Sequence, residues 1–317
     1  MTDISPDSVI KLNRTERRSV GVLCAVVLAR MLGLFLLLPV IAVWAASFDQ
    51  ATPLLIGLCV SGYGLTQMAL QIPMGSLSDA IGRRPVIVGG LCLFILGSLL
   101  AANADSIYAL VAGRLLQGAG AISAALTAWL ADTTRPELRI RSTAILGASI
   151  GGSFILALLL GPVLAGIMPI ASMFLLSAGL GVLAIIALGF MPKDTGRGPV
   201  HVGSVRFKDL LAMSALRLDI VWVFFLHAVL TALFVCLPFS LVERTGQSAS
   251  SQWSVYLVAL LASLLVVIPL LRKTERAAPR AYGQWAWVLL ILGLLGIAGS
   301  GNQLWVLILS LGLFFCG

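Results

Sequence analysis

The chain is poor in charged residues and almost without histidine. Asp, Glu, Lys and Arg make up 11% of its 317 residues, whereas 59% are hydrophobic. A single water-soluble globule cannot bury so large an apolar fraction, so the composition predicts a protein that uses lipid as its solvent. A membrane-bound lipid-modifying enzyme would need clustered histidines or aspartates, and the only histidines are His201 and His227. The composition therefore disfavours a membrane enzyme or receptor.

Cysteine is also scarce, and its spacing excludes common metal and redox motifs. The five cysteines all lie in apolar runs and include no C-x-x-C pair. Such residues usually pack as small buried groups. We therefore expect no metal site, no redox centre and no cofactor.

What the sequence has in abundance is apolar runs of about 20 residues, the length that crosses a bilayer. They predict spans at 20–46, 53–74, 86–104, 107–131, 142–167, 170–191, 219–242, 252–271 and 282–299. A tenth run begins near Gln303 and is still apolar at Gly317. Its helix would reach only about 22 Å, less than a bilayer core of about 30 Å. We expect an all-α polytopic membrane protein with nine spans and a partial tenth, and a longer natural chain.

The basic residues predict the orientation of these spans. Of the 21 Lys and Arg residues, 18 lie in the N-terminal arm or in alternate loops. By the positive-inside rule, the N-terminus and these loops are expected on the cytoplasmic side. The arm, residues 1–19, lacks the pattern of a cleaved signal peptide. The net charge of +8 then reflects topology and attraction to anionic lipid, and it does not indicate a nucleic-acid partner.

A short polar segment, residues 75–85, joins the second and third predicted spans. Gly82 can take a left-handed conformation there, and Pro85 suits the first position of the next helix. Asp79 lies four residues before Arg83, so the two side chains can form an ion pair across the turn. The segment is therefore predicted to be a tight hinge.

This hinge resembles the signature loop of the major facilitator superfamily, G-x-L-x-D-(R/K)-x-G-R-(R/K), with Ala80 where the family usually has a cation. The resemblance implies two six-helix bundles around a central cavity and a hinge that stabilises the outward-open state. The hinge residues it assigns are Gly75, Asp79, Gly82, Arg83 and Arg84.

Asp132 ends the fourth predicted span. A carboxylate at the C-terminal end of a helix is unfavourable unless a cation balances it. Arg83 is expected on the same side of the membrane, so we predict a cluster of Asp79, Arg83 and Asp132 that latches the inner ends of the helices. A purely structural ion pair is the alternative.

Two arginines lie inside predicted spans. Arg30 is about 15 Å deep, where an unpaired Arg costs about 2.5 to 3.5 kcal/mol on insertion scales. It therefore needs a cavity or a partner, unless it snorkels to the surface. Arg114 and Gln117 belong to an R-L-L-Q-G run that matches the R-x-x-Q-G element of the superfamily. The R-x-x-G run at Arg30 resembles the YajR-like branch of drug and proton antiporters.

Other polar residues within the spans are candidates for a substrate or proton pathway. Tyr63, Gln67 and Gln71 recur every four residues and so share one helical stripe. Either this stripe lines a substrate path or it bonds to a neighbouring helix. His227 lies about 12 Å into the seventh span, and histidine exchanges protons near physiological pH. It either carries a coupling proton or bonds, uncharged, to another helix.

The fifth span resembles in part the antiporter signature G-x(8)-G-x-x-x-G-P-x-x-x-G, through Gly152, Gly161, Pro162 and Gly166, with Ala157 in place of a glycine. Small residues at this spacing allow close helix packing, and a Gly-Pro pair can bend a helix. Packing without any bearing on transport direction is the alternative.

The two halves share an L-F-x-x-L-P run, at 34–39 and 233–238. We predict an N-terminal arm at 1–19, a six-helix bundle at 20–192, a cytoplasmic linker with an interfacial helix at 193–218, and an incomplete second bundle at 219–317.

The resemblance implies a transporter in the bacterial inner membrane that moves a small-molecule substrate by alternating access, with proton-coupled efflux expected. Proton-coupled uptake and an inactive truncated copy remain alternatives. No catalytic residue is needed, and the expected partners are the lipid bilayer, the solute and protons.

Overall fold

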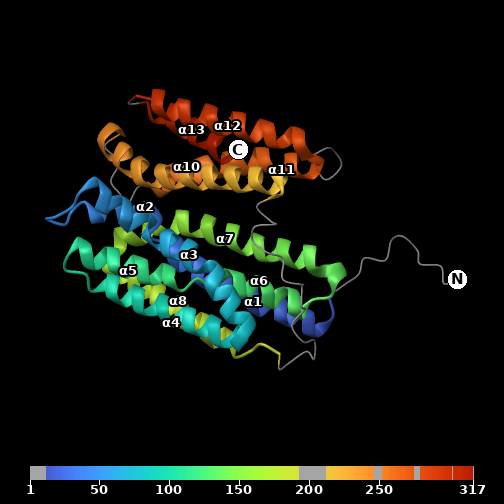
Figure 1. Ribbon diagram of the computed structural model, residues 1–317. Helices are drawn as coiled ribbons and strands as arrows, with labels where there is room; N and C mark the ends of the chain where they lie inside the picture. Colours follow the sequence, from blue (N-terminus) through green and yellow to red (C-terminus); the bar gives the residue numbers. More distant parts are fainter. Residues whose placement is uncertain (1–11, 193–211, 246–251, 275–278, 302, 317) are drawn as a thin grey trace.

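The computed structural model describes residues 12–192, 212–245, 252–274, 279–301 and 303–316, and all regular structure in these ranges is helical (Figure 1). The helices that form the first group in space are α1 (Arg14–Phe35), α2 (Leu38–Ala45), α3 (Pro53–Ile81), α4 (Arg83–Ala102), α5 (Ile107–Ala119), α6 (Ser123–Thr133), the short η1 (Pro136–Leu138), α7 (Arg139–Ile167) and α8 (Ile170–Leu188). The second group contains α10 (Ser214–Thr245), α11 (Trp253–Thr274), α12 (Pro279–Gly299) and α13 (Leu304–Cys316).

Seven helical segments are long and apolar enough to cross a membrane, and three shorter apolar stretches lie in α11, α12 and α13, within the part of the chain that the structure describes. Large apolar side chains such as Leu54, Met68 and Ile72 lie exposed on the outside of the helices. An apolar exterior is what a lipid environment requires. The all-helical membrane fold expected from the sequence is confirmed.

Two of the predicted spans are interrupted rather than continuous. The first breaks at Leu36 and Leu37, between α1 and α2. Pro39 is the second residue of α2 and has no backbone N–H to bond to the preceding turn, so it suits a new helix start. The fourth span breaks between α5 and α6 at residues 120–122. At this break Gly120 packs directly against the backbone of Gly90 in α4, where a side chain would collide.

The hinge is tighter than the sequence indicates. Gly82 alone separates α3 from α4, with φ of 98° and ψ of 155°. This positive φ favours glycine, which has no Cβ to clash. Pro85 is the third residue of α4 and not the first, and residues 75–81 continue α3. Most of the predicted loop is therefore helical. A search for apolar runs ends a span at its first polar residues, so it does not detect that the helix continues through them.

The first group is held by contacts of α1 with α7 and α8, of α4 with α5 and α8, and of α3 with α5. The second group lies beside it in Figure 1, and α10 contacts α2 and α3 while α11 contacts α7. The predicted linker at 193–218 falls largely outside the described residues, and α10 begins at Ser214, before the expected 219. Helix α1 likewise begins at Arg14, inside the arm that was expected to precede it.

Candidate functional site

The hinge residue Arg83 joins three helix ends. Its Nε donates to Oδ2 of Asp132 at 3.0 Å, and its Nη1 donates to the Ser78 hydroxyl at 2.7 Å. Arg83 also forms an ion pair with Asp79, four residues earlier. The C-terminal ends of α3 and α6 and the start of α4 are thereby tied together. We call this end of the first group the hinge end.

The two acidic partners of Arg83 differ in their exposure. The side chain of Asp132 is 18% exposed, whereas that of Asp79 is 65% exposed. A pair that is shielded from water is screened less by solvent and salt. The structure brings the predicted cluster together, and it makes Asp132 the main partner of the arginine. Arg84, by contrast, is exposed.

Gly75 lies where α3 approaches the start of α6. A Cβ built on Gly75 would be 3.2 Å from Cβ of Ala124, closer than most side chains tolerate. The glycine therefore permits the close approach of α3 to α6, the helix that ends near Asp132.

Arg30 lies deep in the first group and is only 1% exposed. Its Nη2 donates to Oε1 of Gln67 at 3.1 Å and to the carbonyl of Gly120 at 2.8 Å. The break between α5 and α6 therefore supplies a free carbonyl for this guanidinium. Nε of Arg30 and Oε1 of Gln71 are buried without a hydrogen-bond partner among the described residues. Each of these two atoms therefore has hydrogen-bonding capacity that no described residue uses.

Arg114 is fully buried on α5. Its Nε donates to the carbonyl of Cys59 at 2.8 Å, and its Nη2 donates to that of Val60 at 3.3 Å. Its Nη1 donates to Oε1 of Gln117 at 2.7 Å, and its guanidinium carbon lies 4.6 Å from the ring centre of Tyr63. Such an arrangement over an aromatic face is a cation–π contact.

Gln117 extends this network into α4. Its Nε2 donates to the Ser98 hydroxyl at 2.7 Å, which in turn donates to the carbonyl of Phe94 at 2.8 Å. All these side chains are buried, so the network fixes how Arg114 points. Sequence reasoning did not single out Ser98, because a lone serine in an apolar helix carries no pattern of its own.

Both buried arginines are held by neutral acceptors, and neither pairs with a carboxylate in the described ranges. Tyr63 and Gln67 from the predicted stripe bond to neighbouring helices, while Gln71 retains a free acceptor. Two guanidinium groups in an apolar interior create a positive potential. This arrangement can attract an anionic or hydrogen-bond-accepting group, and it needs no covalent chemistry.

The structure does not bring His227 into this cluster. His227 lies exposed on α10, and its Nδ1 is 2.9 Å from the carbonyl of Val223 one turn earlier. The histidine was expected on the inward-facing side of its span, and in the described part of the chain its ring contacts its own helix.

The predicted packing motif of α7 holds at one place only. Gly161 and Pro162 are buried, and a Cβ on Gly161 would be 2.9 Å from Cγ of Pro39 at the break between α1 and α2. A Cβ on Gly152 would meet no atom within 4 Å, and Gly166 is exposed. Of these glycines, Gly161 is the one that the described structure packs against another helix. Glycine spacing alone does not show which positions face a neighbouring helix.

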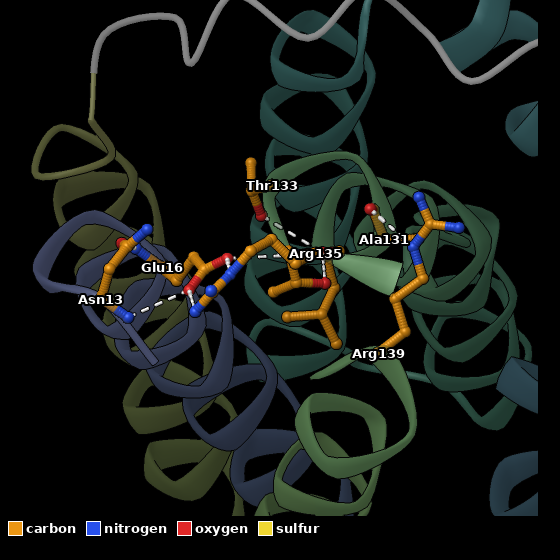
Figure 2. Close-up of polar contacts among 8 residues, drawn as sticks. Asn13, Glu16, Ala131, Thr133, Arg135 and Arg139 are labelled. Atoms are coloured by element: carbon orange, nitrogen blue, oxygen red, sulfur yellow. Dashed lines mark hydrogen bonds and ion pairs between the residues drawn. The ribbon is translucent and has the colours of Figure 1, made fainter. Parts of the chain in front are cut away.

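A third ion pair at the hinge end was missed from the sequence. Glu16 near the start of α1 binds Arg135 in the connection between α6 and α7 (Figure 2). The signal that could have found Glu16 is the N-x-x-E pattern from Asn13, a capping box. The structure shows both hydrogen bonds of this box.

Comparison with known proteins agrees with this architecture. The profile of the Major Facilitator Superfamily matches residues 23–317. The inner membrane transport protein YajR of Escherichia coli strain K12 is 35% identical over 319 residues, which cover 96% of this chain and 68% of that relative. The class B tetracycline resistance protein of Escherichia coli is 30% identical over 184 residues, covering 56% of this chain and 45% of the relative.

The fold also matches a solved structure. The crystal structure of the human organic anion transporter MFSD10 (TETRAN) superimposes with a TM-score of 0.69 at 22% identity, covering 96% of this chain and 83% of that chain. At this identity the likeness concerns the fold alone. Because the family profile spans nearly the whole sequence and the helices adopt the corresponding fold, the chain belongs to the Major Facilitator Superfamily.

Proposed function

We propose that this protein is a secondary active transporter that exports small or amphipathic solutes in exchange for protons. The observation that carries the proposal is the pair of fully buried arginines, Arg30 and Arg114, in a chain of this superfamily. Buried cations in membrane helices mark solute or ion pathways. The chain spans about two thirds of the length of its YajR relative.

The mechanism we propose is alternating access. Two helix bundles rock about a central site, and the ion pairs of Arg83 bias which side is open. The basic loops favour a cytoplasmic location for the N-terminus and the hinge end. The relative YajR is an inner membrane protein, which favours the bacterial inner membrane for this chain.

Export is favoured over uptake by the names of several relatives, which include tetracycline and multidrug resistance proteins. Uptake by the same fold is the second candidate. A membrane enzyme or receptor is disfavoured by the family and by the scarcity of histidine. The site residues for solute and proton are proposed to be Arg30, Tyr63, Gln67, Gln71, Arg114, Gln117 and His227.

Everted membrane vesicles test the direction of transport. In vesicles acidified inside, adding tetracycline or a small amphipathic dye that the protein accepts should release protons, reported by recovery of a quenched pH probe. Vesicles carrying Arg30→Leu serve as the control and should show no recovery, since the buried site would lose one of its two guanidinium groups. Accumulation of the same solute against its gradient into intact cells would contradict export and support uptake.

His227→Ala tests the proton pathway. If this histidine carries the coupling proton, the variant should lose the dependence of transport rate on pH, because an alanine side chain cannot bind a proton. The matched control is His201→Ala, which replaces the other histidine of the sequence. An unchanged pH profile in His227→Ala would assign the proton to another group, as the contact of His227 with its own helix would suggest.

A further inference from the structure

The Glu16 carboxylate is buried at the hinge end, with its side chain 3% exposed. Oε1 of Glu16 accepts from Nε of Arg135 at 2.9 Å and from the backbone N–H of Arg135 at 3.2 Å. Oε2 accepts from Nη2 of Arg135 at 3.0 Å and from the backbone N–H of Asn13 at 3.0 Å. Four donors thus converge on one carboxylate, as Figure 2 shows for the pair with Arg135.

This geometry fixes the orientation of the Arg135 guanidinium and also balances its charge. A guanidinium that binds both carboxylate oxygens has little rotational freedom, and such two-point pairs are among the strong hydrogen bonds of proteins. The hydrogen bond to Glu16 raises the pKa of Arg135 above its usual value. Because the Arg135 backbone N–H also binds Glu16, the carboxylate holds the main chain of the connection and not only a side chain.

The main chain held in this way leads directly to the hinge. Asp132, the acidic partner of Arg83, is three residues before Arg135. Thr134 lies between them and donates its hydroxyl to the carbonyl of Leu130 at 2.7 Å. Arg139, on the other side of the connection, donates through Nε to the carbonyl of Ala131 at 3.2 Å. These bonds satisfy carbonyls in the last turns of α6, so the segment from Asp132 to Arg135 is fixed at several points.

We propose that Glu16 is a positioning residue for the hinge: by clamping Arg135 it holds Asp132 where it can bind Arg83. The start of α1 thereby becomes part of the latch that α3, α4 and α6 form. The importance of Glu16 for transport rests on the proposed function, whereas the structural coupling between Glu16 and the hinge does not. Loss of the Glu16 charge should loosen the α3–α4 turn, although the hydrogen bonds of Glu16 are with Asn13 and Arg135 and not with that turn.

Hydrogen–deuterium exchange of the purified 317-residue chain in lipid nanodiscs tests this coupling. In Glu16→Gln, amide exchange is expected to rise about threefold to tenfold in two places, residues 131–138 and the turn at 79–85, because loss of a charged hydrogen bond promotes local opening. Asp132→Asn should raise exchange at 79–85 to a similar extent. The matched control is Glu137→Gln, which makes the same chemical change at an exposed position of the same connection and should leave both segments unchanged.

The outcomes separate a positioning role from a local one. If Glu16→Gln raises exchange only at 131–138 and the start of α1, the clamp is local and the proposal is overturned. Should Glu16→Gln fail to fold, Glu16→Asp keeps the charge on a shorter side chain and is expected to raise exchange at both segments by less. Unchanged exchange at 79–85 in the folded Asp variant would also overturn the proposal.

Transport is measured on the same variants in everted vesicles. If exchange at 79–85 rises while transport is unaffected, the positioning role stands and the proposed latch function fails. If no variant, including the parent chain, moves solute, the transporter assignment of this chain fails while the exchange result still decides the coupling.

Discussion

Replacing Gly118 with alanine is expected to remove most of the correctly folded protein from the membrane. Gly118 lies on α5 where α3 crosses it, and a Cβ there would be 2.6 Å from the carbonyl carbon of Tyr63, with the Tyr63 oxygen and the Thr66 hydroxyl closer still. Backbone atoms cannot rotate away as a side chain can. The two helices must therefore separate, at a cost at or above the about 1–3 kcal/mol typical of overpacking.

Separation of α3 from α5 would have further consequences. The Thr66 hydroxyl donates to the carbonyl of Leu115 at 2.7 Å across this contact. Arg114 reaches the carbonyls of Cys59 and Val60 across the same gap. A shift that lengthened these bonds would leave a buried guanidinium without acceptors, which is costly in an apolar interior.

The measurement is the fraction of protein that elutes as a single species in size-exclusion chromatography after detergent extraction, together with the thermal unfolding temperature. Gly64→Ala is the matched control, because it makes the same change on α3 where a Cβ would meet no atom within 4 Å. It is expected to match the parent chain or to be more stable by up to about 1 kcal/mol, since alanine favours helix. Equal behaviour of the two variants would mean that α3 and α5 are not in contact at Gly118.

Asp132→Asn is expected to lower the transport rate at least about tenfold while the protein still inserts normally. The change removes the charge that Nε of Arg83 binds at 3.0 Å, and a charged hydrogen bond of this kind contributes about 1.5–3 kcal/mol. A conformational equilibrium shifts about tenfold for each 1.4 kcal/mol of difference between its states. Arg83→Gln should have the same effect, since it removes the other partner.

The exposed partner is expected to matter less. Asp79→Asn should change the transport rate by no more than about threefold, because ion pairs open to water contribute about 0–1 kcal/mol. Arg84→Gln, next to Arg83 but exposed, is the control for charge loss at the turn. Transport is measured in vesicles and the amount of protein in the membrane by immunoblotting. If Asp79→Asn lowered the transport rate as much as Asp132→Asn, the exposure of the two carboxylates would not determine their importance for transport.

The hinge was the part of the site that the sequence predicted best. The spacing of Asp79 and Arg83, the glycine at position 82 and the carboxylate at the end of the fourth span are all local features. Such features indicate a turn and its charges without knowledge of the fold. The hinge pattern misplaced Pro85, which is the third residue of α4 and not the first. In the fifth span, a Cβ on Gly152 meets no atom of the described residues within 4 Å, so the role of this glycine stays a prediction.

The sequence also located the two buried arginines but not their partners. Depth within a span shows that Arg30 requires an acceptor, yet one acceptor is the carbonyl of Gly120 at a helix break that the apolar pattern conceals. Arg114 likewise binds two backbone carbonyls of another helix. Every residue has a backbone carbonyl, so residue type does not predict which carbonyls accept hydrogen bonds from these arginines.

By itself, therefore, the sequence determined that the chain enters lipid, where its main spans lie and which turn carries the signature charges. These properties follow from apolar content and from spacing within one helix. Only the tertiary structure decided that Glu16 clamps Arg135, that Asp132 is the shielded partner of Arg83, and that α3 and α5 meet at Gly118. Each of these depends on which helices lie side by side, because burial and hydrogen-bond geometry arise between segments that are distant along the chain.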